Sequence, residues 1–179
     1  KLAKFAEMET FEHVIQAPFN KIEQKDFRLK GKWAKDFFKN DNPLILELGC
    51  GKGEYSVELA EKNPNQNYIG VDIKGSRLYN GAKLANEKGL KNVAFLRTNI
   101  EIISQFFDEK EIAEIWLTFP DPQMKKTRKR LTSTSFLTRY RQFLKPEGII
   151  HLKTDSNFQY TYTSALVHLN EFNILAETD

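Results

Sequence analysis

Residues 44–53 read Leu-Ile-Leu-Glu-Leu-Gly-Cys-Gly-Lys-Gly, and the architecture of the chain follows from them. The compact apolar run at the start predicts a strand that is covered on both faces of a sheet. Glycines at 49, 51 and 53 allow a tight turn whose backbone can come close to a ligand. The amphipathic segment 54–63 follows at once and predicts a helix. A strand, a glycine turn and a helix in this order indicate a site for a nucleotide-like cofactor.

The spacing of the glycines separates the cofactors that use such a turn. A dinucleotide-binding turn needs a small residue at position 54, where this chain has Glu54, so NAD is disfavoured. A triphosphate loop needs Ser or Thr after its Gly-Lys pair, but Lys52 is followed by Gly53. The E-x-G-x-G-x-G arrangement instead resembles the first motif of the class I methyltransferases. Its opening acid, Glu47, can then face S-adenosylmethionine, which carries sulfonium and ammonium cations and no phosphate.

Short apolar runs and amphipathic stretches alternate along the rest of the chain. Strands are expected at 44–48, 68–72, 93–97, 115–119 and 149–153, and helices at 54–63, 76–88, 100–107, 133–143 and 158–169. Five strand-helix units predict a doubly wound α/β fold with a mostly parallel sheet and helices on both faces. The resemblance of the glycine turn to the class I methyltransferases implies the Rossmann-like form of this fold. In such a fold, ligands bind beyond the carboxyl ends of the strands.

The length of 179 residues suits one domain with a full core. Residues 1–43 differ from the rest in being rich in Phe and Lys, and Trp33, Phe37 and Phe38 predict a short helix there. We therefore expect a short helical N-terminal extension over 1–43 that packs on a methyltransferase domain over 44–179. Because the chain stops within what reads as a new strand, 172–176, we expect this domain to lack its C-terminal end.

Composition argues against several other classes of protein. The longest apolar stretches, such as 112–119, are far below the roughly 20 residues that a membrane span requires, and no signal-peptide core is visible. The single Cys50 cannot form an intrachain disulfide, so a cytoplasmic setting fits best. Three scattered His residues predict no metal site. Nothing in the sequence indicates an obligatory protein partner.

Polar residues follow the second and third predicted strands. Asp72 ends the second strand, where a carboxylate can accept both ribose hydroxyls of a nucleoside or cap the following turn. Asn99 follows the third strand and can bond an adenine edge through its amide, although a lone Asn is more often a turn residue. Cys50 is better explained as a small loop residue than as a nucleophile, since no His lies nearby in the sequence.

A second motif, Pro120-Asp121-Pro122, follows the fourth predicted strand. The two prolines stiffen the loop, so that the Asp121 carboxylate is presented at the rim beside the donor, although an isolated motif of this kind would be a plain turn. Five of the six residues from Lys125 to Arg130 are basic. Such a run is either a solvated loop or a surface that contacts RNA phosphates.

With these motifs in view, the sequence is similar to the bacterial tRNA (guanine-N7-)-methyltransferase family. The resemblance rests on the glycine turn, the Pro-Asp-Pro segment with its basic tail, a strand ending in Leu152-Lys153-Thr154-Asp155, and an N-terminal stretch that includes Phe5, Val14-Ile15-Gln16 and Leu29-Lys30-Gly31-Lys32-Trp33. It runs along nearly the whole chain. It implies methyl transfer from S-adenosylmethionine, leaving S-adenosylhomocysteine, to N7 of a guanine in the variable loop of tRNA, at position 46.

The resemblance also implies roles for individual residues. The donor site would be lined by Glu47, Gly49, Gly51, Gly53, Asp72, Asn99 and Asp121. Lys125 and Asp155 would contact the substrate, and Asp121 is the residue that the family treats as catalytic. The sequence departs from the family where Gln123-Met124 replace a usual Trp and where Asn99 replaces a frequent Asp. The family's T-x-x-Y-E substrate segment falls beyond the end of this chain.

The chemistry of the implied reaction sets expectations for the acceptor side. Guanine N7 has an in-plane lone pair and no proton, so direct in-line displacement at the methyl group needs no general base. We expect Asp121 to orient the guanine through its N1 and amino donors, or to hold the methionyl ammonium, with catalysis resting chiefly on alignment. Beyond Lys125, the cations expected to contact RNA are Lys126, Arg128, Lys129 and Arg130.

Two other functions stay open on the sequence alone. A methyltransferase for a small molecule or a protein would share the glycine turn and would not bind tRNA. A non-catalytic RNA-binding module would keep the basic run and bind the donor without turnover.

Overall fold

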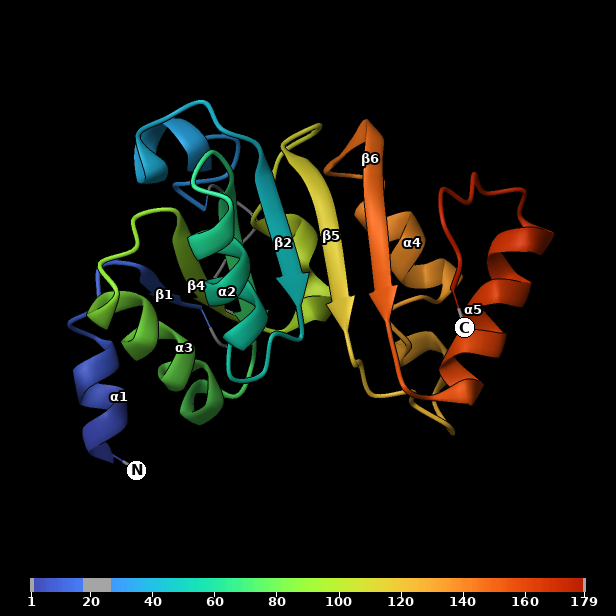
Figure 1. Ribbon diagram of the computed structural model, residues 1–179, viewed down its shortest axis with the longest axis horizontal. Coiled ribbons are helices and arrows are strands. Elements are labelled where there is room, and N and C mark those ends of the chain that lie inside the picture. Colours follow the sequence, from blue (N-terminus) through green and yellow to red (C-terminus); the bar gives the residue numbers. More distant parts are fainter. Residues whose placement is uncertain (1, 18–26, 179) are drawn as a thin grey trace.

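The structure, a computed structural model, describes residues 2–17 and 27–178 and holds one parallel sheet between two layers of helices (Figure 1). Its six strands stand in the order β1-β4-β3-β2-β5-β6, and every neighbouring pair is parallel. The strands are β1 (Val14–Gln16), β2 (Leu44–Leu48), β3 (Asn67–Asp72), β4 (Val93–Arg97), β5 (Ile112–Thr118) and β6 (Leu144–Lys153). This arrangement confirms the predicted doubly wound α/β class.

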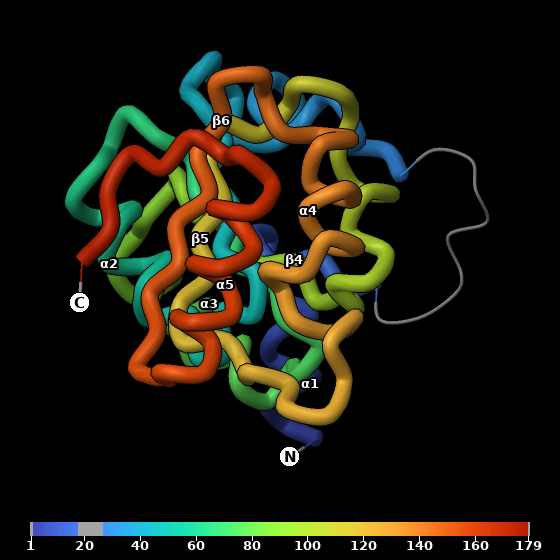
Figure 2. The backbone as a smooth tube through the Cα atoms, turned by 90° about the vertical axis from the view of Figure 1, so that its right-hand side faces the viewer, coloured from blue at the N-terminus to red at the C-terminus, as the bar shows by residue number. Residues whose placement is uncertain are grey.

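Helices of three kinds precede, connect and follow the strands. The α-helices are α1 (Leu2–Met8), α2 (Glu54–Lys62), α3 (Gly75–Glu87), α4 (Thr134–Tyr140) and α5 (Asn157–Leu169). A π-helix, η1, spans Trp33–Phe38, and 3-10 helices span Ile100–Gln105 (η2) and Thr127–Lys129 (η3). Seen along the sheet, α2 and α4 lie on opposite sides of β5 and β6 (Figure 2). Among the described residues no helix is long and apolar enough to cross a membrane.

Strand β2 packs against a hydrophobic core on each face of the sheet. All five of its residues are buried. Leu44, Leu46 and Leu48 point into an aromatic core with Trp33 and side chains of η2 and α4, whereas Ile45 points into a second core beneath α2 and α3. Alternate residues of a strand face opposite sides of a sheet, so one apolar run serves two cores.

The order of the strands reverses at β2. The chain moves from β2 outward to β3 and β4 on one side, and then crosses to β5 and β6 on the other. A crevice outside the carboxyl ends of the strands at such a switch point is where ligands bind in open α/β sheets. The turn after β2 and the loop after β5 both leave from this point.

Several predicted elements differ from the structure at their ends or in kind. Strands β5 and β6 begin earlier than predicted, at Ile112 and Leu144. The early part of β6 was missed because Pro146 and Gly148 interrupt its apolar run. The expected helix at 100–107 is a 3-10 helix over Ile100–Gln105. The strand expected at 172–176 was wrong: this segment has no ladder partner among the described residues and is irregular.

The N-terminal stretch supplies a strand of the sheet as well as the predicted helix. Val14 pairs with Phe95 and Gln16 with Arg97, so that β1 forms the edge next to β4. The predicted short helix is present as η1, in which the Trp33 indole donates to the Phe106 carbonyl oxygen at 2.9 Å. The division into an extension over 1–43 and a domain over 44–179 stays a prediction.

Candidate active site

The glycine turn after β2 is anchored to the neighbouring strand. The backbone N–H groups of Gly49 and Cys50 both donate to the Val71 carbonyl oxygen, at 2.8 and 3.0 Å. Gly49, Gly51 and Gly53 all have left-handed backbone conformations, with φ of 77°, 57° and 74°. A side chain other than glycine rarely adopts such a conformation, which explains the repeated glycine.

Two of these glycines have different further reasons to lack a side chain. A Cβ on Gly53 would lie 2.5 Å from Cε1 of the buried Phe95 ring, so packing of α2 on the sheet excludes it. A Cβ on Gly51 would meet none of the described residues within 4 Å. Open space above the Gly51 backbone is what a ligand that approaches the turn closely requires.

Asp72, at the end of β3, lies against this turn. Its Oδ2 accepts from the Gly51 backbone N–H at 2.9 Å, and its Oδ1 accepts from the Lys74 backbone N–H at 2.7 Å. The structure therefore brings Asp72 and the turn together, and the carboxylate also caps the next turn. Each carboxylate oxygen can accept more than one hydrogen bond, so capacity remains for a ligand hydroxyl.

Glu47 is 4% exposed and joins three elements at the switch point. Its carboxylate accepts from the Ser56 hydroxyl of α2 and from the Thr118 hydroxyl of β5, both at 2.5 Å. Burial raises the pKa of Glu47, and the hydrogen bonds from Ser56 and Thr118 oppose that rise. Glu47 thus fixes the distance between the glycine turn and the end of β5.

Cys50 and Asn99 have structural explanations beside their predicted ones. Burial, together with the nearby carboxylates Glu47 and Asp72, raises the pKa of the Cys50 thiol, so the thiol stays protonated and unreactive. The Asn99 side-chain oxygen accepts from the Glu101 backbone N–H at 3.0 Å and caps η2. Its contact with an adenine edge stays a prediction.

The Pro-Asp-Pro loop leaves β5 directly after Thr118. Phe119 has a φ of 47°, and its backbone N–H donates to the Lys153 carbonyl oxygen at 2.7 Å. Asp121 is exposed, and its Oδ1 accepts from the Gln123 backbone N–H at 2.9 Å. The loop is therefore braced at its base, and Asp121 lies at the rim of the sheet three residues beyond the Thr118 hydroxyl that Glu47 holds.

Arg130 differs from the other cations of the basic run. It is 5% exposed, and its guanidinium donates to the carbonyl oxygens of Pro122 and Met124, at 3.1 and 3.2 Å. The same group lies over the rings of Phe158 and Tyr162 on α5, 4.7 and 4.4 Å from their centroids. Arg130 is thus engaged within the protein and braces the Pro-Asp-Pro loop, which leaves little of it for a phosphate.

The remaining predicted residues lie at the surface, in the segments that follow β5 and β6. Lys125, Lys126, Arg128 and Lys129 are exposed, and Lys129 forms an ion pair with Glu101 at 3.3 Å. Asp155 is exposed in the link between β6 and α5. Sequence reasoning missed Ser56 and Thr118, since hydroxyl residues in a helix and at a strand end carry no signal until the fold sets them beside Glu47.

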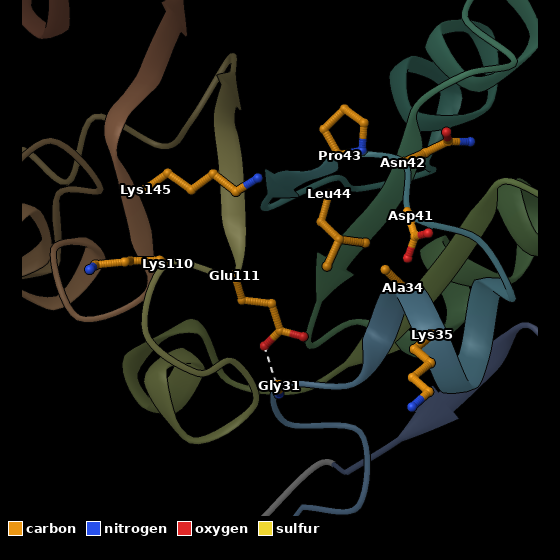
Figure 3. A pocket seen from close by; sticks show the side chains of 10 residues that line it. All are labelled: Gly31, Ala34, Lys35, Asp41, Asn42, Pro43, Leu44, Lys110, Glu111 and Lys145. Carbon is orange, nitrogen blue, oxygen red and sulfur yellow. Dashed lines mark hydrogen bonds between the residues drawn. The ribbon is translucent and has the colours of Figure 1, made fainter.

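A hollow lies at the opposite end of the sheet. It is lined by Gly31, Ala34, Lys35, Asp41, Asn42, Pro43, Leu44, Lys110, Glu111 and Lys145, near the starts of β2, β5 and β6 (Figure 3). Glu111 accepts there from the backbone N–H groups of Gly31 and Trp33, at 2.8 and 3.2 Å. The carboxylate therefore fastens the N-terminal stretch to the sheet, and the hollow lies away from the glycine turn.

The fold has clear relatives among solved structures. The structure of an antibiotic related methyltransferase superposes with a TM-score of 0.57 at 18% identity, over 85% of this chain and 87% of that one. The aminoglycoside resistance methyltransferase NpmB1 gives a TM-score of 0.56 at 20% identity, over 78% and 69%. A family model described as "Putative methyltransferase" matches residues 41–179. Fold and family model together define a methyltransferase with a Rossmann-like sheet.

Curated relatives narrow the class. A tRNA (guanine-N(7)-)-methyltransferase of Bacteroides thetaiotaomicron is 58% identical over 174 residues, which are 97% of this chain and 69% of that protein. One of the same name from Christiangramia forsetii is 57% identical over 177 residues, or 98% and 79%. The chain belongs to the tRNA (guanine-N(7)-)-methyltransferase family.

Proposed function

We propose that this protein transfers a methyl group from S-adenosylmethionine to N7 of a guanine in the variable loop of tRNA, at position 46. The observation that carries the proposal is the pair of hydrogen bonds by which Glu47 joins α2, behind the glycine turn, to Thr118 at the base of the Pro-Asp-Pro loop. A methyl donor on the turn and a base at the loop would then be neighbours. Alignment of two reactants in this way supplies a large share of catalysis.

The donor side has residues that suit S-adenosylmethionine. The open backbone of Gly51 would admit the nucleoside, and the Asp72 carboxylate beside it would accept the ribose hydroxyls. Glu47 and Asp72 make this end of the sheet anionic, which favours a cationic ligand over a pyrophosphate. Bound there, the cofactor supplies a methyl group on a sulfonium, and S-adenosylhomocysteine is the product. Gly49, Gly53 and Asn99 complete the proposed donor site.

On the acceptor side, the N7 lone pair of guanine forms the new bond to carbon while the carbon–sulfur bond breaks and sulfur keeps the electron pair. The guanine ring takes up the positive charge. An Asp121 carboxylate within reach of the base would orient it by accepting from N1 and the amino group, and would stabilise the developing charge. If Asp121 instead holds the methionyl ammonium, it fixes the other reactant. In either role it aligns the reactants and removes no proton.

Exposed cations would hold the tRNA backbone. Lys126, Arg128 and Lys129 would contact phosphates, with Lys129 exchanging Glu101 for a phosphate, while Lys125 and Asp155 would lie against the substrate. Arg130 is withdrawn from this group because its guanidinium is buried. Action on tRNA would place the protein in the cytoplasm, and we propose no obligatory protein partner.

The test is to incubate the protein with methyl-labelled donor and bulk tRNA and to map the modified base. We expect label at N7 of the variable-loop guanine and none in a tRNA whose position 46 is adenine. Label in protein, or in a small molecule only, would establish another kind of methyltransferase. Donor binding without any transfer would establish a non-catalytic module. Asp121→Ala should slow the single-turnover rate; an unchanged rate would remove Asp121 from catalysis.

A further inference from the structure

Phe119 is far more exposed than the aromatic residues within β3 and β4. It follows β5 directly, between Thr118, which holds Glu47, and Pro120-Asp121. Phe119 is 49% exposed, whereas Tyr68 within β3 and Phe95 within β4 are buried. A large apolar side chain at the switch point of the sheet therefore faces solvent beside the proposed catalytic carboxylate.

The backbone holds Phe119 in this position against its own preference. A φ of 47° is uncommon for a bulky residue, and glycine would adopt it without strain. The hydrogen bond from the Phe119 N–H to the Lys153 carbonyl oxygen, at 2.7 Å, fastens this conformation to the end of β6. Strained residues of this kind gather at functional sites, where the surrounding structure maintains them.

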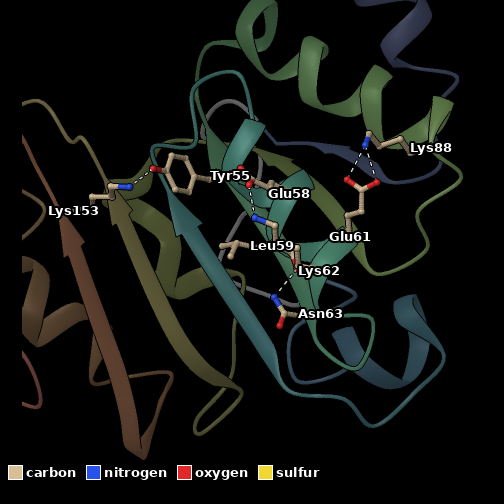
Figure 4. Close-up of polar contacts among 8 residues, drawn as sticks. All are labelled: Tyr55, Glu58, Leu59, Glu61, Lys62, Asn63, Lys88 and Lys153. Atoms are coloured by element: carbon tan, nitrogen blue, oxygen red, sulfur yellow. Dashed lines mark hydrogen bonds and ion pairs between the residues drawn. The ribbon is translucent and has the colours of Figure 1, made fainter.

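Two further side chains flank the ring. The Lys153 ammonium donates to the Tyr55 hydroxyl at 2.7 Å, and it lies 5.2 Å from the centroid of the Tyr55 ring and 5.7 Å from that of Phe119. The Tyr55 and Phe119 rings are tilted by 57° with centroids 6.4 Å apart. Figure 4 shows Lys153 reaching from the end of β6 to Tyr55 at the start of α2. The three residues thus come from the start of α2, the loop after β5 and the end of β6.

We infer that Phe119, backed by Tyr55 and Lys153, is the platform on which the target guanine stacks. The inference rests on the proposed function and adds a binding surface to it. A purine has a flat π-face that stacks on aromatic side chains, and a ring beside Asp121 would leave the base edge free to meet the carboxylate. Methylation at N7 makes the base cationic, and an aromatic face attracts a cation, so stacking would strengthen as the reaction proceeds.

The experiment uses a tRNA transcript with 6-thioguanosine at position 46, irradiated on the protein and mapped by mass spectrometry. We expect an adduct on the Phe119 peptide with the wild type. Phe119→Tyr, which keeps the ring, should retain the adduct and turn over within about threefold of the wild type. Phe119→Leu, which keeps apolar bulk alone, should lose most of the adduct and about tenfold or more in kcat/KM.

Controls separate this inference from others. Phe172→Leu makes the same change near the end of the described chain and should leave both readouts unaltered, and calorimetry with S-adenosylhomocysteine should show equal donor affinity in all variants. An adduct confined to residues 125–130, or undiminished in Phe119→Leu, would overturn the inference. An adduct on Phe119 without methylation of unmodified tRNA would uphold the platform and refute the proposed function.

Discussion

The Glu47 carboxylate accepts a hydrogen bond from the Thr118 hydroxyl at 2.5 Å, across the point where the strand order reverses. Glu47 stands one residue from the end of β2, and Thr118 is the last residue of β5. The turn proposed to bind the donor and the loop proposed to present the substrate are therefore linked by a buried side-chain contact in addition to the pairing of β2 with β5. Changes to that contact should affect both stability and alignment.

Thr118→Val keeps the shape of the side chain and removes the hydroxyl. The buried Glu47 carboxylate then retains Ser56 but loses one hydrogen bond, which should lower the free energy of unfolding by about 1–3 kcal/mol. Methylation should slow as well, because the base of the Pro-Asp-Pro loop loses its side-chain contact with Glu47 of β2. Urea unfolding and single-turnover rates provide the two measurements. Thr118→Ser should recover most of both; wild-type behaviour of Thr118→Val would show that the contact is not needed.

Arg130→Lys tests the brace of the same loop. A lysine cannot bond the Pro122 and Met124 carbonyl oxygens together with a planar fork, so we expect a loss of about 2 kcal/mol in stability and a slower methylation rate. The salt dependence of tRNA binding should not change. Arg128→Lys, at an exposed neighbouring position, is the matched control. Unaltered stability in Arg130→Lys would show that Arg130 does not brace the loop.

Unlike Arg130, the exposed cations should affect tRNA binding and leave stability nearly unchanged. The double variant Lys126→Ala with Arg128→Ala removes two proposed phosphate contacts, so the slope of log affinity against log salt should fall by about 0.9 for each contact. Stability should change little, because these side chains are exposed. Filter binding at several salt concentrations measures the slope. An unaltered slope would mean that these residues are merely solvated.

Strands that are buried on both faces were predictable from the sequence. Leu44–Leu48 and Val93–Arg97 have the predicted bounds, because a continuous apolar run bounded by polar residues has few alternatives. β1 was missed, because three residues make no pattern and its pairing with β4 depends on the tertiary fold. The strand expected at 172–176 was wrong because β-propensity alone does not supply a partner strand.

The candidate site was predictable only in part, and Arg130 illustrates the limit. In the sequence it is the last of a basic run, and nothing local distinguishes it from Lys129. Its burial comes from Phe158 and Tyr162, which the fold brings over it from α5. Glycine spacing, by contrast, is a local signal, since each left-handed conformation is a property of one residue.

The edge of the sheet should show a pH dependence through His13. Its Nε2 lies 2.8 Å from the Ala82 carbonyl oxygen, and burial lowers the pKa of the imidazole below its usual 6.5. The unfolded chain binds the proton more readily, so the contribution of neutral His13 to stability is present above about pH 6.5 and is lost as the pH falls towards the folded pKa.

His13→Gln retains an N–H donor without the titration. The difference in the free energy of unfolding between the wild type and His13→Gln should therefore shrink below pH 6.5, as urea unfolding at several pH values would measure. His168→Gln, at an exposed position, is the control and should leave this trend in place. A difference that is constant with pH would mean that His13 titrates alike in both states.

Gly51→Ala and Gly53→Ala should separate ligand binding from packing. Both impose left-handed backbone on alanine, at a cost of about 1 kcal/mol each. At Gly53 the new methyl group also meets the Phe95 ring, so the loss of stability should be larger by about 1–3 kcal/mol. At Gly51 the methyl group enters open space, so the fold should survive while the affinity for S-adenosylhomocysteine falls at least tenfold. Calorimetry and urea unfolding measure the two effects, and donor affinity that is unchanged in Gly51→Ala would show that the cofactor does not approach this turn.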